Sequence, residues 1–352
     1  MKNVSNSSFR SKAVVNAAIL GASGYTGHET IRLLLNHYKV NIKKLIGEKS
    51  KGKVINEIFS SLTGVDLPKI EALEDVNFKD IDVIFSCMPS GKLASIIHNL
   101  PKNVFLIDLS ADFRIKDINL YEDYYGKHQN SRFLKQFTYG LTEINKSEIK
   151  KSRFISCPGC YPTSILLPMI PILNSQEVTM KDIIVDSKSG ITGAGRNLRK
   201  ELLFSENIGS IKAYGNGNHR HKPEIEFHIT KKTSKKINIV FTPHLIPINR
   251  GILSTIYLRG NITKIYKLLK SKFNKDKFVN IYKLGNLPKI SDVVGTNNCN
   301  IGLLSHNSKN YIILVSVIDN LLKGASGQAV QNMNLCLGFP EDLGLDQQPL
   351  WP

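Results

Sequence analysis

The stretch Val14-Val15-Asn16-Ala17-Ala18-Ile19-Leu20-Gly21-Ala22-Ser23-Gly24-Tyr25-Thr26-Gly27 decides the fold class of this 352-residue chain. Its first seven residues are mostly apolar, which is typical of a buried strand, and a glycine-rich turn follows at once. The next segment, His28–His37, has apolar residues at helical spacing. A strand, a glycine turn and a helix in this order open a doubly wound nucleotide-binding domain, so we predict a Rossmann-type α/β fold.

The glycine turn itself predicts nucleotide binding. Its glycines allow the backbone to approach a pyrophosphate, whose charge then faces the N-terminus of the following helix. Glycines could serve any tight turn, but their place between a strand and a helix favours the nucleotide. The predicted cofactor contacts in this turn are Gly21, Ser23, Gly24, Tyr25, Thr26 and Gly27.

The residues after the second predicted strand, Val40–Ile46, select the type of cofactor. An acid there favours the ribose hydroxyls of NAD, whereas cationic groups favour the 2′-phosphate of NADP. Here Glu48 is followed by Lys49-Ser50-Lys51. We therefore predict NADP(H), with Ser50 and Lys51 as contacts, and a solvated turn is the alternative for each lysine.

Further apolar runs predict two sheets. Residues 82–87 and 104–109 continue a parallel sheet, whereas 183–187, 237–242, 251–258 and 311–318 predict a second, mixed sheet. Residues 325–337 are expected to form a helix with Ala329, Val330, Met333 and Leu337 on one face, which returns to the first domain. We predict an NADP-binding domain over 13–159, completed by a C-terminal helix within 321–352, and an α+β substrate and oligomerisation domain over 160–320.

Cys160 is the predicted nucleophile. It lies between a Pro-Gly turn and a helix start at Ser164, and the N-terminus of a helix lowers the pKa of a thiol. Cys157 and Cys160 form a C-x-x-C, but no second such pair completes a zinc site, so we predict no metal. The five cysteines are few and odd in number, which favours reduced thiols in the cytoplasm over a disulfide framework.

His219 and His221 are the predicted acid/base candidates for this thiol. They are two residues apart, so on an extended segment both side chains would point the same way. A thiolate nucleophile needs such a proton carrier nearby. His228 and His244 are weaker candidates.

Three loops carry residues suited to anions, and a strand precedes two of them. They are 187–196, which is rich in glycine and hydroxyl groups, 109–114 and 247–251. The arginines in these loops could bind carboxylate or phosphate with two hydrogen bonds, and an ion pair at the surface is the alternative.

The formal net charge of +18 invites a nucleic-acid interpretation. Because the lysines are spread along the chain, a solvated surface is the better explanation, and we predict no nucleic-acid partner. No apolar run is long enough to cross a bilayer, and the polar N-terminus, Met1–Asn6, lacks the apolar core of a secretory signal and is predicted to be a disordered tail. We therefore expect no membrane partner and a cytoplasmic protein.

Seven motifs in order resemble the N-acetyl-gamma-glutamyl-phosphate reductase family of arginine biosynthesis, which is related to the aspartate-semialdehyde dehydrogenases. The resemblance runs from Ala17 to Pro352. The motifs are the glycine turn at 21–27, Asp108-Leu-Ser-Ala-Asp-Phe-Arg114, Tyr139-Gly-Leu-Thr-Glu143, Pro158-Gly-Cys-Tyr-Pro-Thr163, Ser189-Gly-Ile-Thr-Gly-Ala-Gly-Arg196, His219-Arg-His-Lys-Pro-Glu-Ile225 and Asp319-Asn-Leu-Leu-Lys-Gly-Ala325. One departure is Cys157, where the family often has asparagine.

The resemblance implies NADPH-dependent reduction of N-acetyl-glutamyl 5-phosphate to the 5-semialdehyde and phosphate, through a thioester on Cys160, by a homodimer or homotetramer. His219 becomes the first choice for the acid/base and His221 the second. Substrate contacts are expected from Ser110, Arg114, Arg196 and Glu224, the last two also as supports for His219. Further cofactor contacts are expected from Ser189, Gly190, Gly193 and Asn320.

Two alternatives remain open at this point. An aspartate-semialdehyde dehydrogenase would use the same thioester chemistry on a shorter substrate with a free amine. A non-catalytic protein that senses NADP or binds nucleic acid would account for the charge but leaves Cys160 and its histidines unexplained.

Overall fold

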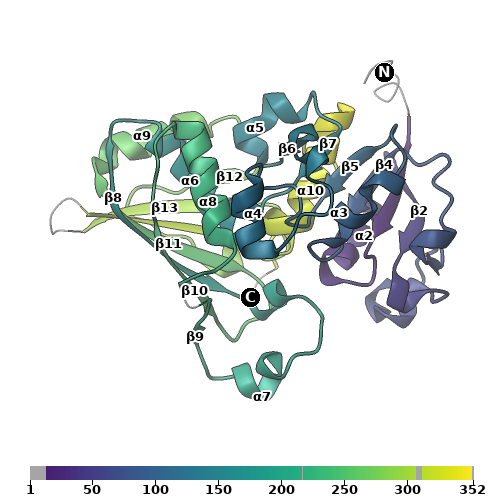
Figure 1. The fold of residues 1–352 in the computed structure, drawn as a ribbon. Helices are drawn as coiled ribbons and strands as arrows, with labels where there is room; N and C mark the ends of the chain where they lie inside the picture. The colour runs from purple at the N-terminus through teal and green to yellow at the C-terminus, as the bar shows by residue number, and fades with distance from the viewer. Residues whose placement is uncertain (1–12, 216, 307–310, 351–352) are drawn as a thin grey trace. The chain divides into compact units, whose positions relative to one another are not determined.

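The computed structural model describes residues 13–215, 217–306 and 311–350, so the predicted tail Met1–Asn6 lies outside the described residues. The chain divides into two compact units. The first unit comprises Met1–Pro158 and Ala325–Asp346, and the second comprises Gly159–Gly324 and Gln347–Pro352. One parallel sheet and one mixed sheet, both with helices, confirm the predicted α/β class (Figure 1).

The first unit is built on a seven-stranded sheet in the order β3-β2-β1-β4-β5-β7-β6, with every pair parallel. The strands are β1 (Val15–Leu20), β2 (Val40–Ile46), β3 (Ile70–Glu71), β4 (Val83–Ser86), β5 (Phe105–Asp108), β6 (Phe137–Tyr139) and β7 (Phe154–Ser156). Strand order reverses at β1, between β2 and β4, so the loop after β1 lies where doubly wound sheets bind ligands.

Five α-helices belong to the described part of the first unit. They are α2 (Tyr25–Leu35), α3 (Lys92–Ile96), α4 (Ile118–Tyr125), α5 (Thr142–Ile149) and α10 (Gly327–Leu337). Helix α2 begins three residues earlier than the predicted His28, because the amide of His28 already donates to Gly24 O at 2.9 Å. Gly27 is therefore part of the helix and not only of the turn.

The predicted C-terminal helix, 325–337, is present, with a different beginning. A π-helical turn, Leu322–Ser326, precedes α10, and every residue of α10 is buried, so the helix has no solvent face. Its polar side chains point at partners inside the first unit: Gln331 donates to Glu143, and Asn332 donates to Gly140 O. These buried amides are therefore hydrogen-bonded, as buried polar groups in folded proteins usually are.

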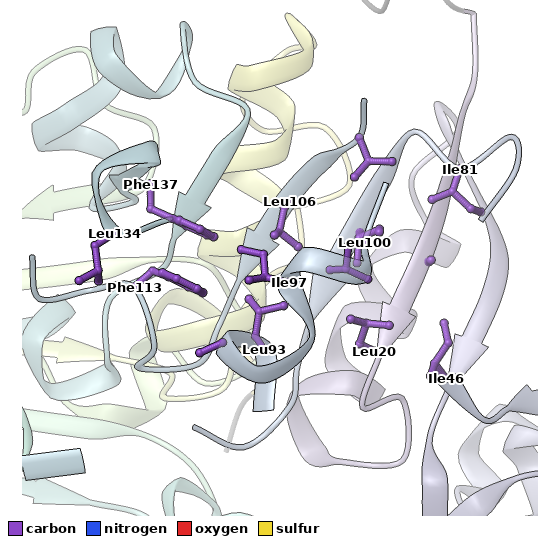
Figure 2. Packing of buried hydrophobic residues seen from close by; sticks show 14 residues of the cluster. Leu20, Ile46, Ile81, Leu93, Ile97, Leu100, Leu106, Phe113, Leu134 and Phe137 are labelled. Atoms are coloured by element: carbon purple, nitrogen blue, oxygen red, sulfur yellow. The ribbon is translucent and has the colours of Figure 1, made fainter. Parts of the chain in front are cut away.

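An apolar cluster fills the space between the first unit's sheet and its covering helices (Figure 2). Leu20, Ile84 and Leu106 come from three adjacent strands, and Leu93 and Ile97 come from the segment after β4. The Phe113 and Phe137 rings stack at 4.0 Å between centroids. The cluster holds the carboxyl ends of β1, β4 and β5 in a common layer, which positions the loops that follow them.

The second unit contains a seven-stranded mixed sheet in the order β12-β13-β14-β11-β8-β10-β9. The strands are β8 (Val178–Ser189), β9 (Lys212–Ala213), β10 (Val240–Leu245), β11 (Ile252–Gly260), β12 (Val279–Ile281), β13 (Cys299–His306) and β14 (Tyr311–Ile318). Strand β11 pairs antiparallel with β8 and β14, whereas β8 and β10 are parallel. The sequence analysis missed β9, β12 and β13: β9 and β12 carry too few residues for a periodic pattern, and the apolar residues of β13 are interrupted by Asn300 and Gly302.

Helix α6 (Cys160–Leu173) packs on β8, β11 and β14 of this sheet, and beside it lie α8 (His221–Thr233) and α9 (Ile262–Lys272). A short helix, α7 (Phe204–Asn207), lies on the excursion that leads to β9 (Figure 1). Almost every side chain of α6 is buried. Its N-terminal residue, Cys160, is half-buried, so the helix presents the thiol from a rigid support.

Two glycines of the turn after β1 should respond differently to alanine. A Cβ on Gly27 would overlap Gly21 O and fall 2.7 Å from Ala22 O, whereas one on Gly24 would meet Gly21 O at an ordinary 3.5 Å. We expect Gly27→Ala to lower the free energy of unfolding by about 1–3 kcal/mol and Gly24→Ala by less than about 1 kcal/mol. Urea unfolding followed by circular dichroism measures both. Equal losses would contradict the close helix–turn packing.

Candidate functional site

The candidate nucleophile is the first residue of α6. Gly159 precedes it in an extended conformation, and Gly159 O accepts from Thr163 N at 2.9 Å and from Thr163 Oγ1 at 3.0 Å. Gly159 has no side chain that could cap the helix, and within the first turn Pro162 has no amide hydrogen. The helix starts at Cys160 itself, four residues before the predicted start.

Two glycines leave room around Cys160. A Cβ on Gly324 would fall 2.9 Å from Cys160 Cβ, and one on Gly159 would fall 2.6 Å from His221 Nε2. The Gly324 backbone therefore touches the nucleophile, and the His221 ring packs directly on the residue before it. The sequence did not assign Gly324 a role, although it lies within the motif 319–325.

Glu224 holds the turn in front of the nucleophile. Its carboxylate is buried on the first turn of α8, and Oε1 accepts from Gly159 N at 2.9 Å. This contact joins the start of α8 to the start of α6. The sequence predicted a support for substrate or for His219, and the contact in the structure is to the backbone next to Cys160.

The two candidate histidines meet, but not in the way that the sequence predicted. His221 begins α8, so the segment is not extended, and the two rings lie edge to face at 4.9 Å between centroids. His219 Nδ1 accepts from His221 N at 3.1 Å, which places the proton of neutral His219 on Nε2. Burial, and then the nearby Arg220 cation, lower the pKa of His219 to about 4.

Two tyrosines that the sequence did not assign, Tyr161 and Tyr214, contact these histidines, and we call this pair the tyrosine box. The Tyr161 ring contacts both His219 and His221 edge to face, and Tyr214 contacts His219 in the same way. Tyr214 OH donates to Tyr161 OH at 3.1 Å. Burial raises the pKa of both phenols, so they remain neutral donors. The position of Tyr161 directly after Cys160 was the one available signal.

The glycine-hydroxyl loop of the second unit is tied to Asn320. Asn320 Oδ1 accepts from Gly251 N at 2.7 Å, and its Nδ2 donates to Thr192 Oγ1 at 3.0 Å. Ser189 Oγ donates to Gly190 O at 3.0 Å, and Gly193 lies beside both Ser189 and Asn320. The predicted cofactor residues Ser189, Gly190, Gly193 and Asn320 thus form one group, which the structure brings together.

The two arginines of the second unit's anion loops differ. Arg196, the last residue of the glycine loop, is exposed. Arg250 Nε lies 3.1 Å from the Oδ2 of Asp319, a carboxylate that is fully buried and also accepts from Gly295 N. Arg250 therefore forms an ion pair, which was the alternative to ligand binding, but its partner Asp319 is buried and not at the surface.

Ser110 and Arg114 lie in the first unit and are both buried. Ser110 Oγ donates to Asp108 Oδ2 at 2.9 Å, and Arg114 donates to Cys157 O and Leu109 O, each at 2.7 Å. Burial, and then the Asp112 carboxylate, raise the pKa of Asp108. These polar groups brace the loop after β5, and their predicted contact with substrate stays a prediction.

The glycine turn of the first unit fits a dinucleotide. Gly21 has φ +80°, and a Cβ there would fall 2.7 Å from Cys87 O. Gly24, directly before α2, is extended and lacks a side chain, so Ser23, Tyr25, Thr26 and Gly27 present backbone at the N-terminus of α2. A larger residue would fill this cradle.

Two charged side chains of the loop after β2 have defined partners in the first unit. Glu48 Oε1 accepts from Leu73 N at 3.1 Å, and Lys51 Nζ lies 2.8 Å from Asp75 Oδ2. Ser50 is buried beside Gly47, whereas Lys51 is largely exposed. The acid that could have favoured NAD is thus engaged by the backbone.

The described residues contain neither a metal-binding cluster nor a membrane-spanning helix. No group of three or more His, Cys, Asp and Glu side chains there could hold a metal ion. No described helix is long and apolar enough to cross a membrane. Each of the five cysteines is a free thiol, and burial raises the pKa of Cys157 to about 12.

Comparisons with known proteins cover both units. Residues 16–152 match the family model described as "Semialdehyde dehydrogenase, NAD binding domain", and residues 160–320 match "Semialdehyde dehydrogenase, dimerisation domain". Among solved structures, aspartate semialdehyde dehydrogenase II from Vibrio cholerae superposes with a TM-score of 0.71 at 16% identity, covering 93% of this chain and 99% of that one. At this identity, the likeness shows the fold.

Curated relatives are much closer in sequence. The N-acetyl-gamma-glutamyl-phosphate reductase of Rhodospirillum rubrum is 44% identical over 348 residues, which cover 96% of this chain and 99% of the relative. The probable chloroplastic enzyme of Oryza sativa subsp. japonica is 41% identical over 351 residues, covering 98% of this chain and 85% of the relative. On this evidence the chain belongs to the N-acetyl-gamma-glutamyl-phosphate reductase family.

Proposed function

We propose that this protein reduces N-acetyl-glutamyl 5-phosphate to N-acetyl-glutamate 5-semialdehyde and inorganic phosphate, with NADPH as reductant. The names of its relatives support the substrate. The observation that carries the chemistry is the half-buried Cys160 at the start of α6, with Glu224 on the preceding amide and His221 packed against Gly159. Aspartate-semialdehyde dehydrogenases share the fold, so the shorter substrate is the second candidate.

Cys160 performs the covalent step in this proposal. Its sulfur attacks the acyl carbon, the C–O bond to the phosphoryl group breaks, and phosphate leaves as a thioester forms. A bound nicotinamide supplies the hydride that reduces this thioester. The N-terminus of α6 would offer electrostatic support to the oxygen on which negative charge develops, and support of this kind contributes most when it is preorganised.

We propose His221 as the proton carrier, in place of His219. His219 Nδ1 is engaged by His221 N, and its pKa of about 4 keeps the ring neutral near pH 7. A general acid/base works best with a pKa near the working pH. His221 packs on Gly159, so it would donate to the developing oxyanion and take the proton back as the C–S bond breaks. His219 would orient His221 within the tyrosine box.

The cofactor sites fit a nicotinamide dinucleotide, in agreement with the "NAD binding domain" match. The glycine turn would hold the pyrophosphate, and Ser50 and Lys51 would bind the 2′-phosphate that makes the cofactor NADP. Asn320 and the 189–193 loop are proposed for the nicotinamide half. Arg196, which is exposed, is the stronger proposal for a substrate carboxylate, with Ser110 and Arg114 as the weaker ones.

The family match and the names of the relatives also bear on the assembly of the protein and its location in the cell. The match to a dimerisation domain supports a homo-oligomer, and we propose a dimer or tetramer. We propose the cytoplasm as its location, although two plant relatives are named chloroplastic. The other predicted partner is the small acyl-phosphate substrate, with no nucleic acid and no membrane.

Cys160→Ser tests the proposed function directly. We expect phosphate-dependent reduction of NADP⁺ with N-acetyl-glutamate 5-semialdehyde by the native chain, and a loss of more than about 1,000-fold in kcat for the variant, because a hydroxyl at this position is not activated. Cys157→Ala is the matched control within the same C-x-x-C and should retain most activity. Turnover with aspartate semialdehyde instead would overturn the substrate, and full activity of Cys160→Ser would overturn the mechanism.

Lys51→Ala tests the choice of NADP. Removing one charged contact to the 2′-phosphate should raise KM for NADPH about tenfold, which is about 1.4 kcal/mol, and leave KM for NADH within about twofold. Lys53→Ala, on the same exposed loop, is the control and should change neither value. Parallel increases for both cofactors in Lys51→Ala would show that the lysine does not read the phosphate.

Asparagine at each histidine separates the two roles. We expect His221→Asn to lower kcat by about 100-fold or more, because the proton carrier is lost, and His219→Asn by only about tenfold, through orientation. The pH profile of kcat should lose a limb in His221→Asn alone. A lost limb in His219→Asn would return the role to His219.

The lowered pKa of His219 also predicts how the stability of the fold changes with pH. The folded-state pKa of His219, about 4, lies below its ordinary value of 6.5, so the unfolded chain binds the extra proton between these values. His219 therefore stabilises the fold fully above pH 6.5, and this contribution is lost as the pH falls toward 4. His219→Asn should flatten the decline of the melting temperature over that window, and an unchanged decline would contradict the lowered pKa of His219.

A further inference from the structure

A chain of three buried hydroxyls runs from the sheet of the second unit to α6. Ser187 of β8 lies 2.7 Å from Ser254 of β11, Oγ to Oγ, and Ser254 Oγ lies 2.8 Å from Ser164 Oγ of α6. All three side chains are 0% exposed. Ser187 and Ser254 are direct cross-strand partners, so the backbone register places their hydroxyls side by side.

The protons of this chain have one consistent direction. Ser164 Oγ donates to Tyr161 O at 2.9 Å, so its oxygen is left to accept. A hydroxyl has one donor and two acceptor sites, so Ser254 can donate to Ser164 and Ser187 to Ser254. Each proton is then used once, and the chain ends on the carbonyl of the residue that follows Cys160.

The hydroxyl chain lies where α6 packs on the sheet through mostly apolar side chains. The buried side chains of α6 are mostly apolar, and apolar packing is not directional, so it holds a helix on a sheet without setting its rotation. Hydrogen bonds do set direction. Ser164 is four residues from Cys160, so both lie on the same side of α6, one turn apart.

We propose that Ser164, Ser254 and Ser187 are positioning residues, whose hydroxyl chain anchors the first turn of α6 to the sheet and thereby sets where the Cys160 sulfur lies. The inference rests on the proposed role of Cys160 as nucleophile, and not on the identity of the acyl substrate. The serines do not touch the reacting atoms; they act through Tyr161 O and the helix.

Ser164→Ala is the decisive variant, because it leaves Ser254 and Ser187 bonded to each other. The rate of Cys160 alkylation by iodoacetamide, followed by peptide-resolved mass spectrometry, should fall about three- to tenfold. The value of kcat should fall by a similar factor, with KM for NADPH unchanged. Ser254→Ala should have at least the same effect, and the double variant should be no worse than Ser254→Ala, since both break one chain.

Ser316→Ala is the matched control. Ser316 is the cross-strand partner of Ser254 on β14 and is equally buried, but its Oγ lies 3.4 Å from Cys299 Sγ. It should leave alkylation and kcat within about twofold of the native values, whatever its effect on the melting temperature. Equal alkylation rates and kcat in Ser164→Ala and Ser316→Ala would overturn the positioning role.

Failure of the proposed function and failure of the hydroxyl-chain proposal would give different results. A native chain that turns over no N-acetyl-glutamate 5-semialdehyde, but whose Cys160 is alkylated more slowly in Ser164→Ala, would overturn the proposed substrate and support the hydroxyl chain. A native chain that is active, with no alkylation difference between it and Ser164→Ala, would overturn the hydroxyl chain alone.

Discussion

A buried hydrogen bond from the Gly159 amide to the Glu224 carboxylate joins the starts of two helices in the second unit. One of these helices begins with Cys160 and the other with His221. A hydrogen bond to a buried charged group contributes about 1.5–3 kcal/mol, and its loss would leave a carboxylate buried beside the thiol. This contact therefore helps to fix the relative position of the nucleophile and its proposed proton carrier.

Close packing completes what this contact begins. Gly159 and Gly324 have no side chains, which lets the His221 ring and the 324 backbone lie against the start of α6. Tyr161, the residue after Cys160, contacts the rings of both histidines. A neutral His219 with a defined tautomer results, because burial disfavours its charged form and the His221 amide occupies Nδ1.

The first unit applies the same physical principle to a different ligand class. Its glycine turn has no side chains where a pyrophosphate would approach, and the N-terminus of helix α2 follows the turn directly. Around the turn, Asp108, Ser110 and Arg114 brace the loop after β5 through internal hydrogen bonds. Their motif could be recognised in the sequence, but whether each group faces a ligand or a neighbour depends on burial, which a motif does not encode.

The sequence by itself determined the α/β class, the strand-turn-helix opening, most of the strands and the family to which the motifs 108–114, 158–163 and 219–225 belong. Local patterns suffice there, because strand periodicity, turn glycines and a cysteine at a helix start are read within a few residues. The tertiary structure decided the contact of Glu224 with Gly159, the ring contact of Tyr161 with His219 and the burial of all of α10. Each of these joins residues that are distant in the chain or depends on solvent exclusion, and neither property has a local signature.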